Sequence, residues 1–179
     1  MKTKVLLSLA AALVCCACVI GGTVAWLKSQ AAVKNTFAVG DVAISLTETT
    51  GNSYKLIPGT TLKKDPKVVV HNQSVSCWVF VKVDKKGGLD DYVSYTIADG
   101  WEELESGIYY RSYVEGSSAN ATYSILKDDE VRISEDLSKS ALSALKGSGK
   151  FPVLSFTAYA VQMSGIPSVN EAWEKVKNL

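Results

Sequence analysis

Histidine is almost absent from this sequence, which contains only His71. A catalytic zinc site usually needs at least two histidines, often on a His-Glu-x-x-His helix, and one imidazole cannot supply them. The sequence also lacks a Gly-x-Ser-x-Gly elbow, a phosphate-binding loop and a dinucleotide fingerprint. We therefore predict no catalytic residue, no metal ligand and no cofactor, and we interpret His71, at the end of an apolar run, as structural.

Cysteine is scarce beyond the first segment of the chain. Three of the four cysteines, Cys15, Cys16 and Cys18, lie in an apolar N-terminal run whose pattern fits a lipoprotein signal poorly. Only Cys77 lies beyond that run, so the rest of the chain cannot form an internal disulfide and must be stabilised by packing. Cys77 alternates in phase with the valines that follow it, which predicts a buried apolar residue and not a nucleophile.

The two signs of charge nearly balance, since the chain contains 19 basic and 18 acidic residues. Both signs are mixed along the chain, as expected for a solvated surface, and we expect no nucleic-acid partner. The acidic runs at residues 90–91 and 128–130 lack the alternating oxygen ligands and the glycine of a calcium loop. We interpret both runs as solvated turns.

The N-terminus has the order of a secretory signal peptide. Lys2 and Lys4 supply a short positive region, and residues 5–20 form an uninterrupted run of apolar and small side chains. We predict that residues 1–25 are a signal peptide. Residues 26–179 are then long enough for one domain with its own core, which we expect outside the cell.

Small residues mark the expected cleavage site. Thr23 and Ala25 occupy the −3 and −1 positions, which makes Trp26 the first residue of the mature chain. A membrane anchor is the alternative, because no charge lies between Lys4 and Lys28. The glycine-rich break in the run favours cleavage, and in both cases the domain lies outside.

Apolar residues in the mature chain mostly recur with period two, which predicts strands with one buried face. Val33, Phe37 and Val39 share one face of the first strand. The phase changes at Gly40, and a second strand follows over residues 42–46. A phase change at a glycine is typical of a bulge or bend, so the first strand is predicted to be separable from the second.

Further strands follow at regular spacing, which favours an antiparallel sandwich or barrel. They are predicted over residues 68–71, 77–83, 92–97, 100–104, 108–114, 123–126 and 151–162. The strand at 77–83 is apolar on both faces, so we place it centrally and covered on both sides. Our choice between the two architectures is an antiparallel β-sandwich.

Two helices complete the prediction. Residues 134–146 form a short helical insertion that ends at a glycine-rich stop. Ser168 and Glu171 form a capping box at the start of a C-terminal helix, and Trp173 is predicted to anchor this helix to the sheet.

Tyrosines cluster on the strand predicted at 108–114. Tyr109, Tyr110 and Tyr113 could line a ligand surface, although core packing is the favoured interpretation, because tyrosine is an ordinary strand residue.

Two runs near the N-terminus, residues 21–27 and 35–48, resemble the opening of the TasA/camelysin-like family of exported Gram-positive proteins. Similar features continue along most of the chain: Pro58-Gly59, Lys64-Asp65-Pro66, the turn at Asn72, Phe156–Gln162 and Glu171-Ala172-Trp173. The resemblance implies a jelly-roll-like sandwich and a signal peptide that the dedicated peptidase SipW processes. It also implies a structural role, since TasA itself forms matrix fibres.

The resemblance points to an exported structural protein of the cell surface or biofilm matrix. In TasA-like assembly the N-terminal strand of one subunit completes the sheet of the next. Residues 26–39, with Val33, Phe37 and Val39, are then the candidate donor strand. The expected partners are other copies of this chain, a SipW-like signal peptidase and an accessory matrix or anchor protein.

Two other functions stay open. Camelysin-like members have been classed as metallopeptidases, but a single histidine and no zinc motif offer no obvious way to activate water. We therefore predict that the chain is not an enzyme. A monomeric surface-binding module, with the tyrosine-rich strands as its face, is the third alternative.

Overall fold

The structure is a computed structural model that describes residues 42–51 and 53–179. The described residues are mostly in strands: β1 (Ile44–Thr47), β2 (Thr61–Lys63), β3 (Lys67–Val70), β4 (Cys77–Lys86), β5 (Val93–Ser94), β6 (Glu102–Glu105), β7 (Ile108–Tyr113), β8 (Ala121–Ser124), β9 (Glu130–Ile133) and β10 (Val153–Gln162). The described residues also form two α-helices, α2 (Lys139–Ser148) and α3 (Val169–Val176), and short 3₁₀ turns at Leu89–Asp91 and Lys127–Asp129.

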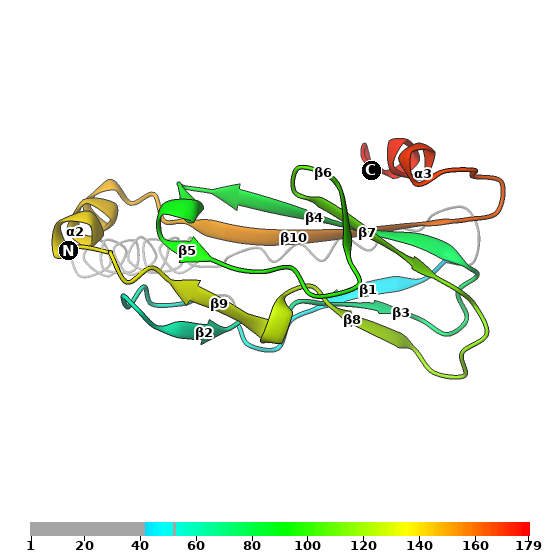
Figure 1. The fold of residues 1–179 in the computed structure, drawn as a ribbon, viewed down its shortest axis with the longest axis horizontal. Coiled ribbons are helices and arrows are strands. Elements are labelled where there is room, and N and C mark those ends of the chain that lie inside the picture. Colours follow the sequence, from blue (N-terminus) through cyan, green and yellow to red (C-terminus); the bar gives the residue numbers. More distant parts are fainter. Residues whose placement is uncertain (1–41, 52) are drawn as a thin grey trace, which may run out of the picture. The chain divides into compact units, whose positions relative to one another are not determined.

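The strands form one four-stranded sheet, in the order β10-β4-β7-β6, and two three-stranded sheets, β1-β3-β8 and β2-β9-β5. All of the strand pairs are antiparallel. In Figure 1 the strands β1, β3 and β8 lie on one side of the four-stranded sheet and α3 lies on the other. The predicted mostly β, antiparallel fold is confirmed, and the arrangement is consistent with a jelly roll.

Strand β4 is central and buried on both faces, as its sequence predicts. Its odd-numbered residues from Cys77 to Val83 face the largest apolar core, between the four-stranded sheet and β1-β3-β8. Phe80 points the other way and is fully buried in a second apolar cluster with α3. Burial on both faces explains why this strand reads as a nearly continuous apolar run.

Helix α3 covers the outer face of the four-stranded sheet. The Ser168 hydroxyl accepts a hydrogen bond from the Glu171 amide at 3.3 Å, which caps the helix as predicted. Trp173 is only 6% exposed, and its ring lies 5.4 Å from that of Phe80 and 5.5 Å from that of Tyr159, measured between centroids. The prediction that Trp173 anchors the helix is confirmed.

Two short strands were not predicted. Strand β2 has three residues, too few to show alternation, and it pairs with β9. The acidic run at 128–130 was interpreted as a turn, but its last residue, Glu130, begins β9. Only the two aspartates before it form the turn, with φ values of 58° and 53°.

Several predicted boundaries differ from the observed ones. The helix predicted at 134–146 begins only at Lys139, because the Ser138 hydroxyl accepts from the Ala141 amide at 3.1 Å and caps it there. The strand predicted at 92–97 is regular only over β5, with a single bridge from Ile97 to Leu126 further on. Strand β8 lies two residues before the predicted 123–126, since its bounds follow its pairing with β3 and not its apolar pattern.

Neither helix in the described part of the chain is both long and apolar enough to cross a bilayer.

Candidate functional site

The residues predicted to act in export and assembly lie outside the described part of the chain. They are the peptidase-site residues Thr23, Ala25 and Trp26, and the donor-strand residues Val33, Phe37 and Val39. The described structure begins two residues before β1, just after the predicted phase change at Gly40. The surroundings of β1 and the free sheet edges are therefore where a site for strand pairing can be sought.

A buried serine fixes the start of β1. Ser74 is 2% exposed, and its hydroxyl accepts from the Ala43 amide and donates to the Ala43 carbonyl, both at 3.0 Å. The His71 amide donates to the same carbonyl at 2.9 Å. Both backbone groups of Ala43 are thus held by the turn after β3, which fixes where the chain enters the sandwich.

A buried aspartate fixes the loop that follows β1. The Asp65 carboxylate accepts hydrogen bonds from the Thr49 amide at 2.9 Å and hydroxyl at 2.6 Å, and from the Thr50 amide at 3.0 Å and hydroxyl at 2.9 Å. These bonds, led by those from Thr49, hold the pKa of Asp65 well below its usual range. Strand β1 is consequently held at both ends.

The neighbouring lysine adds to this attachment. Lys64 is 7% exposed, and its Nζ lies 2.7 Å from a carboxylate oxygen of Glu48. The same ammonium group lies 5.4 Å from the ring centroid of Tyr54 and 5.6 Å from that of Phe156, on β10. These contacts connect the loop after β1 to the edge strand of the other sheet.

We predict that Asp65 makes the stability of the domain depend on acid pH. A carboxyl whose folded pKa is depressed stabilises the fold above its unfolded pKa of about 3.9, and that contribution is lost as the pH falls through the folded value. Urea unfolding of the native protein between pH 6 and pH 2 should show stability falling below about pH 4. Asp65→Asn should be less stable at pH 6 and should lose part of that slope. An unchanged slope would contradict the assignment.

Two strand edges that have no strand partner among the described residues lie next to each other. Within the described residues β10 pairs only with β4, and β1 pairs only with β3. Strands β1 and β10 also approach each other directly. The largest apolar core extends to this boundary through Ile44, Ala158 and Ala160. We call the boundary the β1/β10 edge.

The opposite edge of the four-stranded sheet is protected. Strand β6 carries Glu102, Glu103 and Glu105, and its pairing with β7 is interrupted by an irregularity between the last two. Charges and bulges are the usual devices that keep an edge from pairing with another chain. Neither β1 nor β10 contains a charged residue. The β1/β10 edge is thus the less protected of the two.

The described residues contain no group of three or more His, Cys, Asp or Glu side chains placed to hold a metal ion. Cys77 is fully buried, and burial raises the pKa of its thiol to about 12, so the predicted apolar role fits. In the acidic runs, Asp90 pairs with Lys85 at 2.8 Å and lies exposed as predicted. Asp129 pairs with Lys67 at 3.1 Å and is only partly exposed, so that run is not a fully solvated turn.

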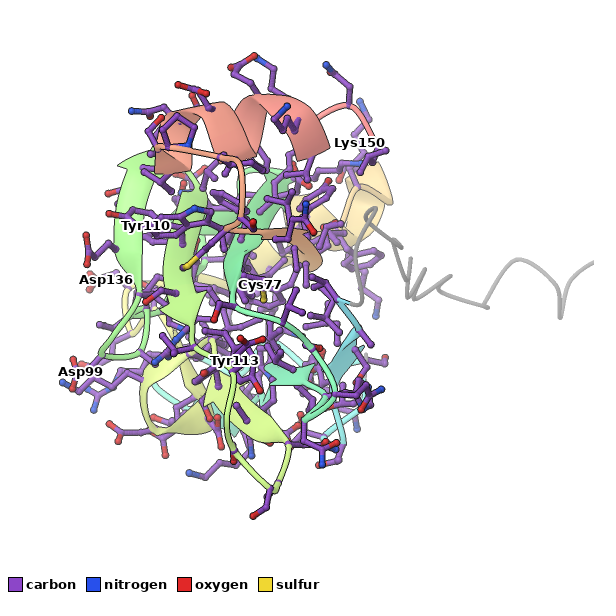
Figure 2. The ribbon with its side chains drawn as sticks, turned by 90° about the vertical axis from the view of Figure 1, so that its right-hand side faces the viewer. Cys77, Asp99, Tyr110, Tyr113, Asp136 and Lys150 are labelled. Carbon is purple, nitrogen blue, oxygen red and sulfur yellow. The ribbon has the colours of Figure 1, made fainter. Side chains whose placement is uncertain are left out.

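The three tyrosines of β7 have different environments. Tyr113 is 3% exposed within the main core, as the packing interpretation predicts. Tyr109 and Tyr110 are half-buried. Figure 2 shows Tyr110 and Tyr113 on one strand, with Tyr110 nearer to α3.

Sequence reasoning did not identify the β1/β10 edge as a site. One signal could have indicated it, because the ten residues of β10 contain no charge, whereas the short β6 contains three glutamates. Whether a strand lies at an edge depends on strand order, which the alternation of apolar residues does not encode.

The described residues form a small antiparallel β-sandwich whose β1/β10 edge carries no charged residue. Residues 1–75 match the family model of the camelysin metallo-endopeptidases. This match confirms the resemblance to the TasA/camelysin family for the N-terminal part of the chain, and it supports the expectation of an exported Gram-positive protein. No curated protein and no solved structure matches the chain.

Proposed function

We propose that this chain is an exported structural protein of the cell surface or extracellular matrix, and that it assembles into fibres by strand donation. In this mechanism a SipW-like peptidase cuts before Trp26, and residues 26–39 of one copy pair with the β1/β10 edge of the next. The single observation that carries the proposal is the contrast between this charge-free edge and the acidic, irregular β6 edge.

The chemistry of the edge suits an added strand. An added strand forms backbone hydrogen bonds along β10, which is ten residues long, and apolar side chains at alternate positions provide further affinity. Val33, Phe37 and Val39 share one face of the candidate donor and can lie against the apolar interior that reaches this edge.

A preformed acceptor strengthens binding, because little entropy is then lost on pairing. The Ser74 and Asp65 contacts hold β1 at both ends, and Lys64 connects the adjoining loop to Phe156 on β10. The acceptor is therefore held in place before a strand is added. An accessory matrix or anchor protein that presents the same edge would start or end a fibre.

A charge placed on β10 tests the proposal. Ser155 is exposed and lies opposite Asp84 on β4, so Ser155→Lys gains a cross-strand partner and should leave the fold intact. A lysine on an edge strand opposes pairing with another chain. We expect fibre formation to slow by at least tenfold, measured by light scattering and electron microscopy.

The matched control places the same charge on the protected edge. Glu103→Lys on β6 should leave assembly unchanged, because that edge takes no part in the proposed pairing. Equal slowing by both variants would show a general effect of charge and would refute the assignment of the edge.

The same purified protein distinguishes the alternatives. Proteolysis that a chelator abolishes would favour the peptidase that the family name describes, and loss of that activity in His71→Ala would place the metal at the one histidine. A protein that stays monomeric at every concentration would favour a surface-binding module.

A further inference from the structure

Asp99 and Gly100 form an exposed turn just before β6. This is the only place in the sequence where a glycine follows an aspartate or an asparagine. The Asp99 side chain is 93% exposed, and it makes no hydrogen bond within the described residues. Figure 2 shows Asp99 at the surface, away from the core residue Tyr113. Neither strand donation nor the β1/β10 edge involves this turn.

The backbone of the turn leaves the Gly100 nitrogen accessible to the Asp99 side chain. The φ angle of Gly100 is +87°, a conformation that glycine adopts readily because it has no Cβ. The Gly100 amide donates no hydrogen bond within the described residues, so no acceptor there holds its proton. The side-chain carboxyl of an aspartate and the amide nitrogen of the next residue are placed to close a five-membered ring.

We propose that Asp99 is a site of spontaneous isomerisation to isoaspartate. The Gly100 nitrogen attacks Cγ of the Asp99 carboxyl group, an N–Cγ bond forms, and the carboxyl hydroxyl leaves with the amide proton as water. The product is a succinimide ring. Water then adds to the main-chain carbonyl carbon of Asp99, and the bond from that carbon to nitrogen breaks. The backbone now runs through Cγ, and the two steps together need no oxidant, reductant or other reactant.

The turn lies between two fixed points. On one side, the Ala98 amide donates a hydrogen bond to the Ile125 carbonyl at 2.9 Å. On the other side, Trp101 Nε1 donates to the Ser124 carbonyl at 2.8 Å, and the Trp101 side chain is only 9% exposed. Both ends of the turn are therefore attached to neighbouring residues of one segment.

Isomerisation changes the length of the chain between these points. An isoaspartyl link adds one carbon atom to the backbone, which lengthens it by about 1.5 Å. We expect the added atom to displace Trp101, which directly follows the turn, and to break its hydrogen bond to Ser124. Because β6 begins at the next residue, Glu102, aged copies of the chain would differ from new ones at the β6 edge.

Peptide mapping of the purified full chain tests the reaction. After storage at neutral pH, the peptide that contains Asp99 should appear in a second form of unchanged mass and different retention time, and electron-transfer fragmentation identifies the isomer. The succinimide should appear as the same peptide lighter by one water. Asp99→Glu should form neither product during the same storage, because its longer side chain would have to close a six-membered ring.

Asp136 is the matched control within the same digest. It is also exposed, but Leu137 follows it. The Leu137 side chain hinders attack by its own amide nitrogen, so we expect roughly tenfold less isoaspartate at Asp136 than at Asp99. Equal amounts at the two sites would overturn the proposal. So would an unmodified Asp99 in the folded chain when a synthetic peptide of residues 96–103 isomerises.

The indole N–H signal of Trp101 in NMR spectra tests the structural consequence, and Trp101→Phe assigns that signal. In the unmodified chain this proton is hydrogen-bonded and buried, so it should exchange slowly with solvent. In the isoaspartyl form, separated by chromatography, exchange should be about tenfold faster. Unchanged exchange would show that the turn absorbs the added atom and would overturn the expected displacement of Trp101.

Discussion

A chain that begins after residue 39 is expected to remain monomeric under conditions in which the chain beginning at Trp26 forms fibres. The truncated protein keeps the acceptor edge, the Ser74 and Asp65 contacts and all three apolar clusters of the described residues. It loses only the candidate donor and its Val33, Phe37 and Val39 side chains. Electron microscopy and sedimentation velocity measure the outcome, and fibres that persist without residues 26–39 would contradict strand donation.

Complementation sharpens this experiment. A synthetic peptide of residues 26–39 should bind the truncated protein at one site, because the acceptor edge has no strand partner among the described residues. The same peptide with Phe37→Lys is the matched control, and it should bind at least tenfold more weakly, since a charge replaces the largest apolar side chain of the donor face. Equal binding of the two peptides would mean that the apolar side chains on one face of the segment do not direct pairing.

Trp173→Ala is expected to lower the free energy of unfolding by about 3–5 kcal/mol. The side chain is nearly fully buried between Phe80 and Tyr159, and its Nε1 donates to a Glu105 carboxylate oxygen at 2.7 Å. Its removal leaves a cavity between α3 and the sheet. Urea unfolding followed by circular dichroism gives the difference.

Trp173→Phe is the matched control for that variant. It keeps a ring against Phe80 but loses the hydrogen bond to Glu105, so it should cost about 1.5 kcal/mol. A Trp173→Ala variant as stable as Trp173→Phe would show that α3 docks through its other buried residues, Ala172 and Val176.

Strong local signals account for what the sequence could predict. The alternation around Cys77, with apolar residues on both faces, indicates a central strand, and the capping box at Ser168 places the start of α3. Each signal lies within about ten residues of chain and needs no knowledge of distant partners. The fold class and the anchoring role of Trp173 follow from such signals.

Long-range pairing accounts for what the sequence could not predict. Strand β2 exists because β9 lies opposite it, some seventy residues later in the chain, and neither has a pattern strong enough on its own. The placement of Trp78, Tyr110 and Glu102 on one face of the sheet likewise depends on register between β4, β7 and β6. The aromatic residues were visible in the sequence, but their shared face with Glu102 was not.

The buried thiol of Cys77 has a consequence for the strength of any assembly. Because its sulfur is enclosed in the core and keeps its proton at neutral pH, an oxidising medium leaves this thiol unchanged in the folded domain. Copies of a chain that begins at Trp26, as proposed, contain no other cysteine and cannot be cross-linked through sulfur unless a subunit first opens. The cohesion of a filament would therefore depend on backbone pairing and apolar contact alone, and subunits joined by a reducible bond would reveal damage to the polymer.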